Sequence, residues 1–203
     1  MTLTELTQRI QKHVPADAVE QVVKWIVEYK ILLIVSRKRK SLLGSYHAPT
    51  RKMPQHRIRV NGDLNPYAFL LTFTHELAHL VTWEQYGRSV APHGEEWKAA
   101  FRKLMAGFLA KAVFPQPLGQ AVANYLKDPE ASSTRNHALY KALNSYGEPK
   151  GEYLENIPTG GYFHLSDGRR FRKLAMLRTY CRCEEIHTGL HYRIHKLMQV
   201  EPV

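Results

Sequence analysis

Residues 66–87 read PYAFLLTFTHELAHLVTWEQYG, and this stretch decides the fold of the larger part of the chain. A proline is well tolerated in the first turn of a helix, so a helix is expected to begin after Asn65-Pro66. Gly87 suits the left-handed position that commonly ends a helix. The stretch between them is apolar and free of further helix breakers. We therefore predict one long central helix.

The middle of this helix carries His75-Glu76-Leu77-Ala78-His79. Residues i and i+4 share one face of a helix, so both imidazoles can reach one Zn²⁺. Glu76 then lies close enough to accept a proton from an attacking water. The competing interpretation is a pair of partly buried histidines with a solvated glutamate. The position in mid-helix, after an apolar run and a β segment, favours the catalytic interpretation.

A catalytic zinc site has three protein ligands and one open position, so a third ligand is needed. The metzincin pattern would place glycine and histidine where Thr82 and Gln85 stand, which excludes that pattern. The remaining candidates are His93, in the loop after the helix, and Glu95 or Glu96 at the start of the next helix. Both glutamates are also explained by the helix dipole, so His93 is preferred.

The segments around the central helix alternate between helix and strand patterns. Residues 15–30, PADAVEQVVKWIVEYK, have valines and isoleucine at helical spacing, with Asp17 as a candidate N-cap. Three short runs, ILLIVSRK, LLGSYHA and HRIRV, are typical of strands. Beyond the central helix, EEWKAAFRKLMAGFLA predicts an amphipathic helix, with Trp97, Phe101, Leu104 and Phe108 on its core face. Further helices are expected around residues 117–127 and 135–146.

From about Gly151 the sequence becomes strand-like, with GGYFHL, RRFRKLAMLRTYCRC and LHYRIHKLMQV as candidate strands. The fold class is therefore α+β, with a metalloprotease domain over residues 1–149 and a small β-rich region over 150–203. Cys181 and Cys183 are the only cysteines and are too close together to staple a fold. Alternate residues of a strand share a face, so both thiols are expected to be buried, without a structural zinc.

The runs SRKRKSLLGSY, HRIRVN, TFTHELAHLVTW and SVAPHGEEWKAAFRKLM, in this order, resemble the SprT-like metalloprotease family over about residues 18–105. The resemblance implies a zincin-like fold with one Zn²⁺ per chain held by His75, His79 and His93, and Glu76 as the catalytic residue. It implies a protein or peptide substrate, including proteins attached to DNA. Many family members carry a C-terminal zinc ribbon with two cysteine pairs, and this chain departs from that pattern at Cys181-Arg182-Cys183.

Composition bears on partners and location. The chain has 203 residues, with 29 Lys and Arg against 18 Asp and Glu, giving a net charge of +11, which favours polyanionic partners. Arg37, Lys38, Arg39 and Lys40 form the strongest basic run and are the candidate nucleic-acid contacts; the same run also suits a solvated sheet edge. The beginning of the chain has no signal pattern and no apolar run reaches membrane-spanning length, so a cytoplasmic protein without a membrane partner is expected.

Two other functional classes are compatible with these patterns. One is a DNA-binding or regulatory protein that keeps the metalloprotease scaffold without cleaving peptides. The other is a zinc hydrolase acting on a small amide in a closed pocket. A peptidase would instead present a free strand edge beside His75 and His79, because such enzymes bind their substrate as an added β-strand. The sequence leaves the oligomeric state open.

Overall fold

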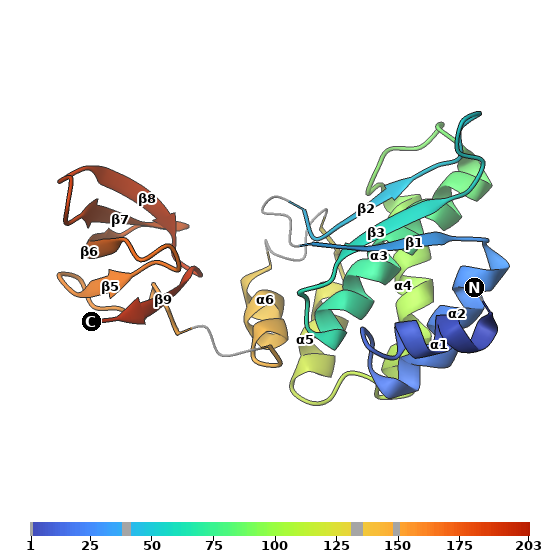
Figure 1. Ribbon diagram of the computed structural model, residues 1–203, viewed down its shortest axis with the longest axis horizontal. Helices are drawn as coiled ribbons and strands as arrows, with labels where there is room; N and C mark the ends of the chain where they lie inside the picture. Colours follow the sequence, from blue (N-terminus) through green and yellow to red (C-terminus); the bar gives the residue numbers. More distant parts are fainter. Residues whose placement is uncertain (1, 38–41, 131–135, 148–150) are drawn as a thin grey trace. The chain divides into compact units, whose positions relative to one another are not determined.

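The computed structural model describes residues 2–37, 42–130, 136–147 and 151–203 (Figure 1). The chain forms two compact units, Met1–Gly147 and Glu148–Val203. Each unit has its own hydrophobic core. The expected α+β class is confirmed.

The first unit begins with a helical layer and a small sheet. Its first elements are α1 (Leu3–Ile10), the 3₁₀ turn η1 (Ala16–Ala18) and α2 (Val19–Glu28). Asp17 lies inside the 3₁₀ turn and Ala18 is the N-cap of α2, so the expectation that Asp17 caps this helix was wrong. The 3₁₀ turn moves the start of the α-helix beyond the position where an Asp17 carboxylate could cap it.

The three predicted strands are confirmed as β1 (Leu32–Ser36), β2 (Gly44–His47) and β3 (Arg57–Asn61). They form a sheet in the order β1-β3-β2, with β1 parallel and β2 antiparallel to β3. This order leaves β2 with a single partner strand among the described residues. β2 is therefore an edge strand, and it packs on the central helix.

The central helix is α3 (Pro66–Tyr86), close to the predicted bounds. Its N-cap Asn65 accepts hydrogen bonds from the backbone N–H groups of Tyr67 and Ala68, at 3.1 and 3.0 Å. Gly87 ends it with φ +61°, which glycine tolerates without steric cost. The helices that follow are α4 (Glu95–Ala110), α5 (Leu118–Tyr125) and α6 (His137–Asn144).

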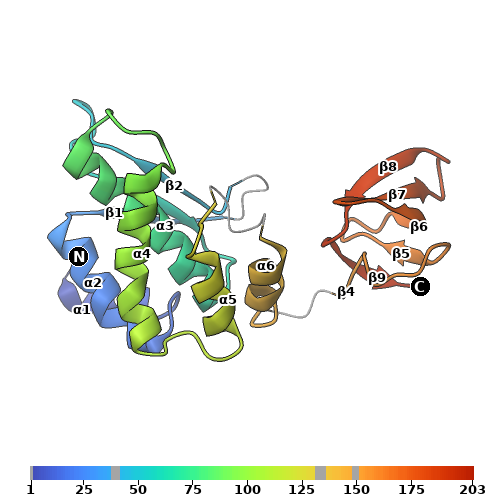
Figure 2. The ribbon, with the colours of Figure 1, turned by 180° about the vertical axis from the view of Figure 1, so that it is seen from behind.

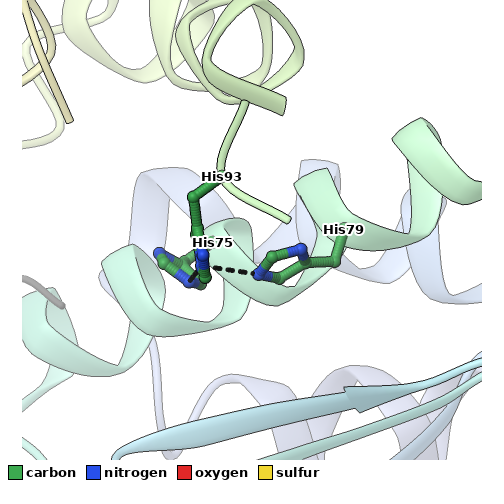
Figure 3. Close-up of side chains that lie close together, drawn as sticks. All are labelled: His75, His79 and His93. Atoms are coloured by element: carbon green, nitrogen blue, oxygen red, sulfur yellow. Dashed lines mark hydrogen bonds between the residues drawn. The ribbon is translucent and has the colours of Figure 1, made fainter. Parts of the chain in front are cut away.

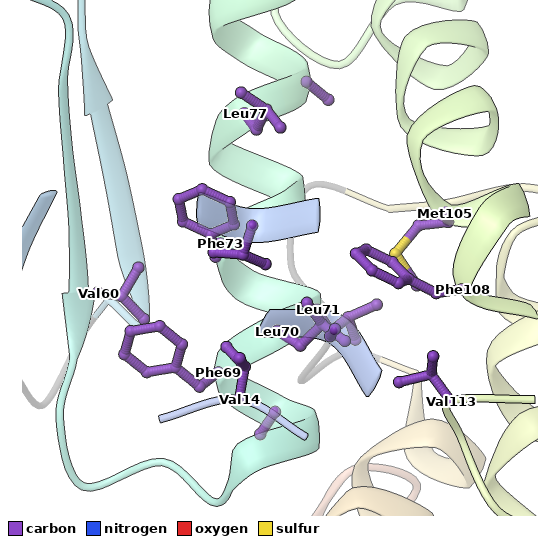
Figure 4. Close-up of a cluster of buried hydrophobic side chains, with 14 of the residues drawn as sticks. Val14, Val60, Phe69, Leu70, Leu71, Phe73, Leu77, Met105, Phe108 and Val113 are labelled. Atoms are coloured by element: carbon purple, nitrogen blue, oxygen red, sulfur yellow. The ribbon is translucent and has the colours of Figure 1, made fainter. Parts of the chain in front are cut away.

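The core explains why α3 is apolar over most of its circumference. The helix lies between the sheet and α4, as the two opposite views show (Figures 1 and 2). Phe69 and Phe73 lie toward Val60 of the sheet, whereas Met105 and Phe108 approach from α4 (Figure 4). A helix covered on two sides must bury residues on two faces. On α4 the fully buried positions are Trp97, Phe101, Met105 and Phe108, with Leu104 only partly buried.

The second unit is a six-stranded antiparallel sheet with the order β4-β9-β5-β6-β7-β8. Its strands are β4 (Glu152–Tyr153), β5 (Tyr162–His164), β6 (Arg170–Met176), β7 (Tyr180–Glu185), β8 (His191–His195) and β9 (Gln199–Pro202). The sequence RRFRKLAMLRTYCRC forms two strands joined by a turn at residues 177–179, where a single run was expected. Among the described residues, no helix is both long and apolar enough to cross a membrane.

Candidate metal centre

His75 and His79 project from the same face of α3, as their spacing of four residues predicts (Figure 3). Their ring centroids are 5.1 Å apart. Both side chains are partly buried. The helix therefore presents two imidazoles as one pair with a common direction.

His93 completes the group from the loop immediately before α4 (Figure 3). Its Nε2 lies 3.1 Å from His75 Nε2 and 3.0 Å from His79 Nε2. The backbone of His93 has φ +62°, a conformation that costs a non-glycine residue energy and that is concentrated at functional sites. The left-handed backbone conformation therefore occurs at His93, the loop residue whose ring lies against those of His75 and His79.

Three converging Nε2 atoms have the donor set and spacing that a zinc site needs. Tetrahedral zinc with bonds of roughly 2.0–2.1 Å separates its nitrogen ligands by about 3.3 Å, so an outward movement of a few tenths of an ångström would accommodate the ion. Among the described residues, this triad is the group of three or more His, Cys, Asp or Glu side chains found within metal-binding distance. The residues present fit a metal with one open coordination position.

Burial keeps these imidazoles in the form that binds metals. Desolvation lowers the pKa of His75 to about 3, and the neighbouring charges of His79 and His93 act in the same direction. Desolvation, followed by the charge of His93, lowers the pKa of His79 to about 4. Burial also lowers the pKa of His93. All three rings are therefore neutral near pH 7, with lone pairs available to a cation.

From the sequence, Trp97 was expected only to belong to the hydrophobic core, and its contact with the histidines was missed. It is fully buried, and its ring centroid lies 4.6, 5.4 and 4.7 Å from those of His75, His79 and His93. Its indole Nε1 donates a hydrogen bond of 3.4 Å to the carbonyl oxygen of His75. One rigid ring thus packs against all three imidazoles. The spacing of four residues from His93 to Trp97 across a helix start was the signal for this arrangement.

Glu76 lies between α3 and the edge strand. It is buried, with 7% of its surface exposed. A Cβ placed on Gly44 of β2 would lie 2.6 Å from Glu76 Oε1 and 2.7 Å from Thr72 Cγ2. The absence of a side chain at residue 44 therefore makes the space that the Glu76 carboxylate occupies. The edge strand and the glutamate are in direct contact beside the histidine group.

A second polar network ties the edge strand to the end of α3. Tyr46 Oη lies 2.9 Å from His56 Nδ1, and His56 Nε2 lies 3.0 Å from Glu84 Oε1. The His56 ring also meets Trp83 edge-on at 5.4 Å. Burial, followed by the charge of Glu84, raises the pKa of Tyr46 well above its ordinary value, so the phenol stays protonated. The network links β2, the start of β3 and α3.

The remaining site candidates lie elsewhere. Glu95 pairs with Lys98 at 3.1 Å and is well exposed, and neither Glu95 nor Glu96 belongs to the metal-binding group. The helix-dipole explanation therefore suffices for both. Arg37 is exposed just after β1, whereas Lys38, Arg39 and Lys40 lie outside the described residues.

The cysteines and one of the C-terminal cations are buried. Cys181 and Cys183 are free thiols on the inward face of β7, and burial raises their pKa values, that of Cys183 to about 12. Lys173, in the basic strand β6, is 2% exposed. Its ammonium group donates to the carbonyl oxygens of Leu154, Glu155 and Ile157. The alternation of side chains along the strand turns Lys173 inward, so this lysine is not available to a phosphate.

The fold and this site define a mixed α+β protein with a three-histidine candidate metal centre and an adjacent buried glutamate. The chain belongs to the SprT-like family, which it matches over residues 4–115, more than half of its length. Proteins named Protein SprT from Shigella boydii, Escherichia coli and Enterobacter are each 47% identical over 55 residues. That match covers 25% of this chain and 33% of each relative. No solved structure matches the chain.

Proposed function

We propose that this protein is a zinc-dependent endopeptidase with a zincin-like catalytic domain. The observation that carries the proposal is that His93 Nε2 lies 3.1 and 3.0 Å from the Nε2 atoms of His75 and His79, beside a buried Glu76. Family membership supports it, since the resemblance implies this ligand set. The matched relatives share only about a third of their length with the chain, so activity and substrate are part of the proposal.

In this proposal His75, His79 and His93 hold Zn²⁺. When bound there, zinc acidifies a water and polarises the scissile carbonyl group. Glu76 accepts one proton from the attacking water while the oxygen of that water bonds to the carbonyl carbon. The C–N bond then breaks, and Glu76 returns that proton to the leaving nitrogen. The protein positions the reacting groups and transfers the proton. The Glu76 carboxylate is ionised again at the end of each cycle.

The substrate is proposed to bind as an extended strand along β2. The backbone groups of one edge of β2 have no partner strand among the described residues. Gly44 of this strand contacts Glu76, so a peptide added to the edge would run past the catalytic carboxylate. Extended peptides commonly bind proteins by such strand addition. This geometry favours a peptide over a small amide in a closed pocket.

DNA-associated proteins are the proposed substrate class. The net charge of +11 supports this, as do the exposed arginines Arg170, Arg172, Arg182 and Arg193 of the second unit. Arg170 and Arg172 lie 5.0 and 6.0 Å from the ring of the exposed Tyr162. Guanidinium groups beside an aromatic ring suit phosphates and unpaired bases.

The double variant Arg182→Gln/Arg193→Gln tests this face. Its oligonucleotide binding should depend less steeply on salt concentration, by the equivalent of about two phosphate contacts. An unchanged salt dependence would argue against contact on this face.

The decisive experiment combines zinc content with proteolysis. Elemental analysis should find one zinc per chain in the wild type and in Cys181→Ala, and loss of zinc in His75→Ala and His93→Ala. Glu76→Gln should keep its zinc and cleave fluorescently labelled casein at least about 100-fold more slowly. Normal cleavage by Glu76→Gln would refute the mechanism. Zinc content without any cleavage, with or without DNA, would favour the regulatory scaffold.

A further inference from the structure

A groove separate from the histidine group lies between α2 and α4, with Val81 of α3 at its floor. Its volume is about 380 Å³. This falls in the range of roughly 300–1,000 Å³ that ligand sites in proteins occupy. None of the three histidines lines it. Occupation of this groove would therefore be independent of the proposed peptidase chemistry.

The walls of the groove are helix faces. On α4 they are formed by residues spaced like one side of a helix, namely Ala100, Lys103, Leu104, Gly107, Phe108 and Lys111. On the other side Gln21, Trp25 and Tyr29 follow one another at intervals of four residues. Trp25 meets Phe108 edge-on at 5.5 Å. The result is an aromatic and aliphatic trough along the helix axes.

Gly107, in the last turn of α4, opens this trough. A glycine inside a helix destabilises it by about 1 kcal/mol relative to alanine. A Cβ at residue 107 would meet no atom within 4 Å, so packing within the chain does not require glycine there. The missing side chain instead allows another molecule to approach the α4 backbone closely. The open space over Gly107 does not depend on the charges of the neighbouring lysines.

The α4 wall of the groove carries a lysine toward each end. Lys103 and Lys111 stand on either side of Gly107 and, among the described residues, neither has an ion pair with an acidic side chain. No lining residue is acidic. Eight residues of helix separate the two lysines by about 12 Å. One small carboxylate cannot contact both, whereas a peptide with acidic residues on each side of an apolar one can.

We propose that this groove binds an acidic, amphipathic peptide segment of a partner protein. An apolar side chain of the partner lies over Gly107 between Leu104 and Trp25, and its flanking Asp or Glu residues meet Lys103 and Lys111. Helical segments commonly bind in grooves of this kind through apolar residues one turn apart. Nucleic acid fits the groove less well, because its phosphates would face an apolar floor.

The test is selection of binders from a random 12-residue peptide library displayed on phage, using the full chain as target. Enriched peptides should combine Leu, Ile, Phe or Trp with Asp and Glu. Measured by fluorescence anisotropy, they should bind Lys103→Glu/Lys111→Glu and Gly107→Leu at least about 10-fold more weakly. The matched variant Lys24→Glu/Lys127→Glu, with the same charge change on exposed residues outside the groove, should stay within about twofold. Casein cleavage by the unliganded variants should equal that of the wild type.

Several outcomes would overturn the proposal. Basic or uncharged selected peptides, equal weakening by the control variant, or no enrichment would each do so. Binding of decanoate in place of peptides would identify a small-molecule site. A wild-type dimer that becomes monomeric in Gly107→Leu, seen by analytical ultracentrifugation, would identify a second copy of the chain as the occupant. Unchanged thermal unfolding would show that each variant is folded.

Discussion

Gly44 and Glu76 are packed so closely that a Cβ on Gly44 would lie 2.6 Å from Glu76 Oε1. The residue from the edge strand therefore determines where the carboxylate on the helix can lie. This contact joins β2, along which the substrate is proposed to bind, to Glu76, the proposed proton acceptor. It also shows how a residue far from the motif in sequence can control it.

Gly44→Ala is expected to reduce proteolysis without loss of zinc. The added methyl group must displace the Glu76 side chain or the strand, and a misplacement of about 1 Å can lower a rate by about 100-fold. Casein cleavage and elemental analysis on the same preparation would measure both effects. Gly107→Ala is the matched control, since its Cβ meets no atom within 4 Å and activity should be unchanged. Wild-type cleavage by Gly44→Ala would mean that the contact is not needed for catalysis.

Trp97→Ala should lower both stability and zinc affinity. Removing a fully buried indole typically costs about 3–5 kcal/mol, and here it also removes the surface on which three imidazoles rest. Trp97→Phe should restore most of the stability because it refills part of the space. Chemical denaturation and competition with a zinc chelator would separate the two effects. Unaltered zinc affinity in a folded Trp97→Ala protein would contradict the positioning argument.

The metal-free protein should become less stable as the pH falls below about 6.5. Burial lowers the folded-state pKa values of His75 and His79 to about 3 and about 4, whereas the unfolded chain titrates near 6.5. The unfolded state therefore binds more protons between these values, and stability present above pH 6.5 is lost on acidification. The loss is on the order of 2–3 kcal/mol per histidine by pH 4.5.

Urea denaturation of the zinc-free protein at several pH values would measure how its free energy of unfolding depends on pH. The matched variant His75→Gln removes one of the buried imidazoles and should make the free energy of unfolding depend less steeply on pH. A slope of the same size in His75→Gln and in the wild type would show that His75 does not contribute to it.

His56→Ala should loosen the edge strand. It removes the hydrogen bonds that join Tyr46 and Glu84 through one imidazole. Each lost bond contributes about 1 kcal/mol, so a stability loss of about 2 kcal/mol is expected. KM for peptides should rise more than kcat falls, because strand addition depends on the position of β2 and the proton acceptor is untouched. A fall in kcat alone would place this network in the chemical step instead.

Lys173→Met should unfold the second unit selectively. Three backbone carbonyls accept from its ammonium group, and the substitution leaves all three without this donor in a buried environment. Limited proteolysis should then degrade residues 148–203 and spare the first unit. Arg172→Met, on the neighbouring exposed position, is the matched control and should resist digestion like the wild type. Equal resistance of both variants would refute the structural importance of Lys173.

Much of the fold was predictable because its signals are local. The helix from Pro66 to Tyr86 is set by the proline at its start, the glycine at its end and the apolar run between them. The strands were recognisable from β-branched residues or from an alternating pattern in short runs. The boundary of α2 was not, because the 3₁₀ turn at Ala16–Ala18 competes with capping by Asp17. The division of β6 from β7 was also missed, since no glycine or proline marks the turn.

The sequence by itself determined the candidate ligand pair His75 and His79, because a helix fixes residues four apart on one face. It also determined that His93, in the adjacent loop, was the preferred third candidate. Only the tertiary structure decided that the ring nitrogens meet, that Trp97 lies against all three rings, and that Gly44 makes space for Glu76. Such contacts join separate helices, loops and strands. Their geometry depends on how those elements pack, which local periodicity does not specify.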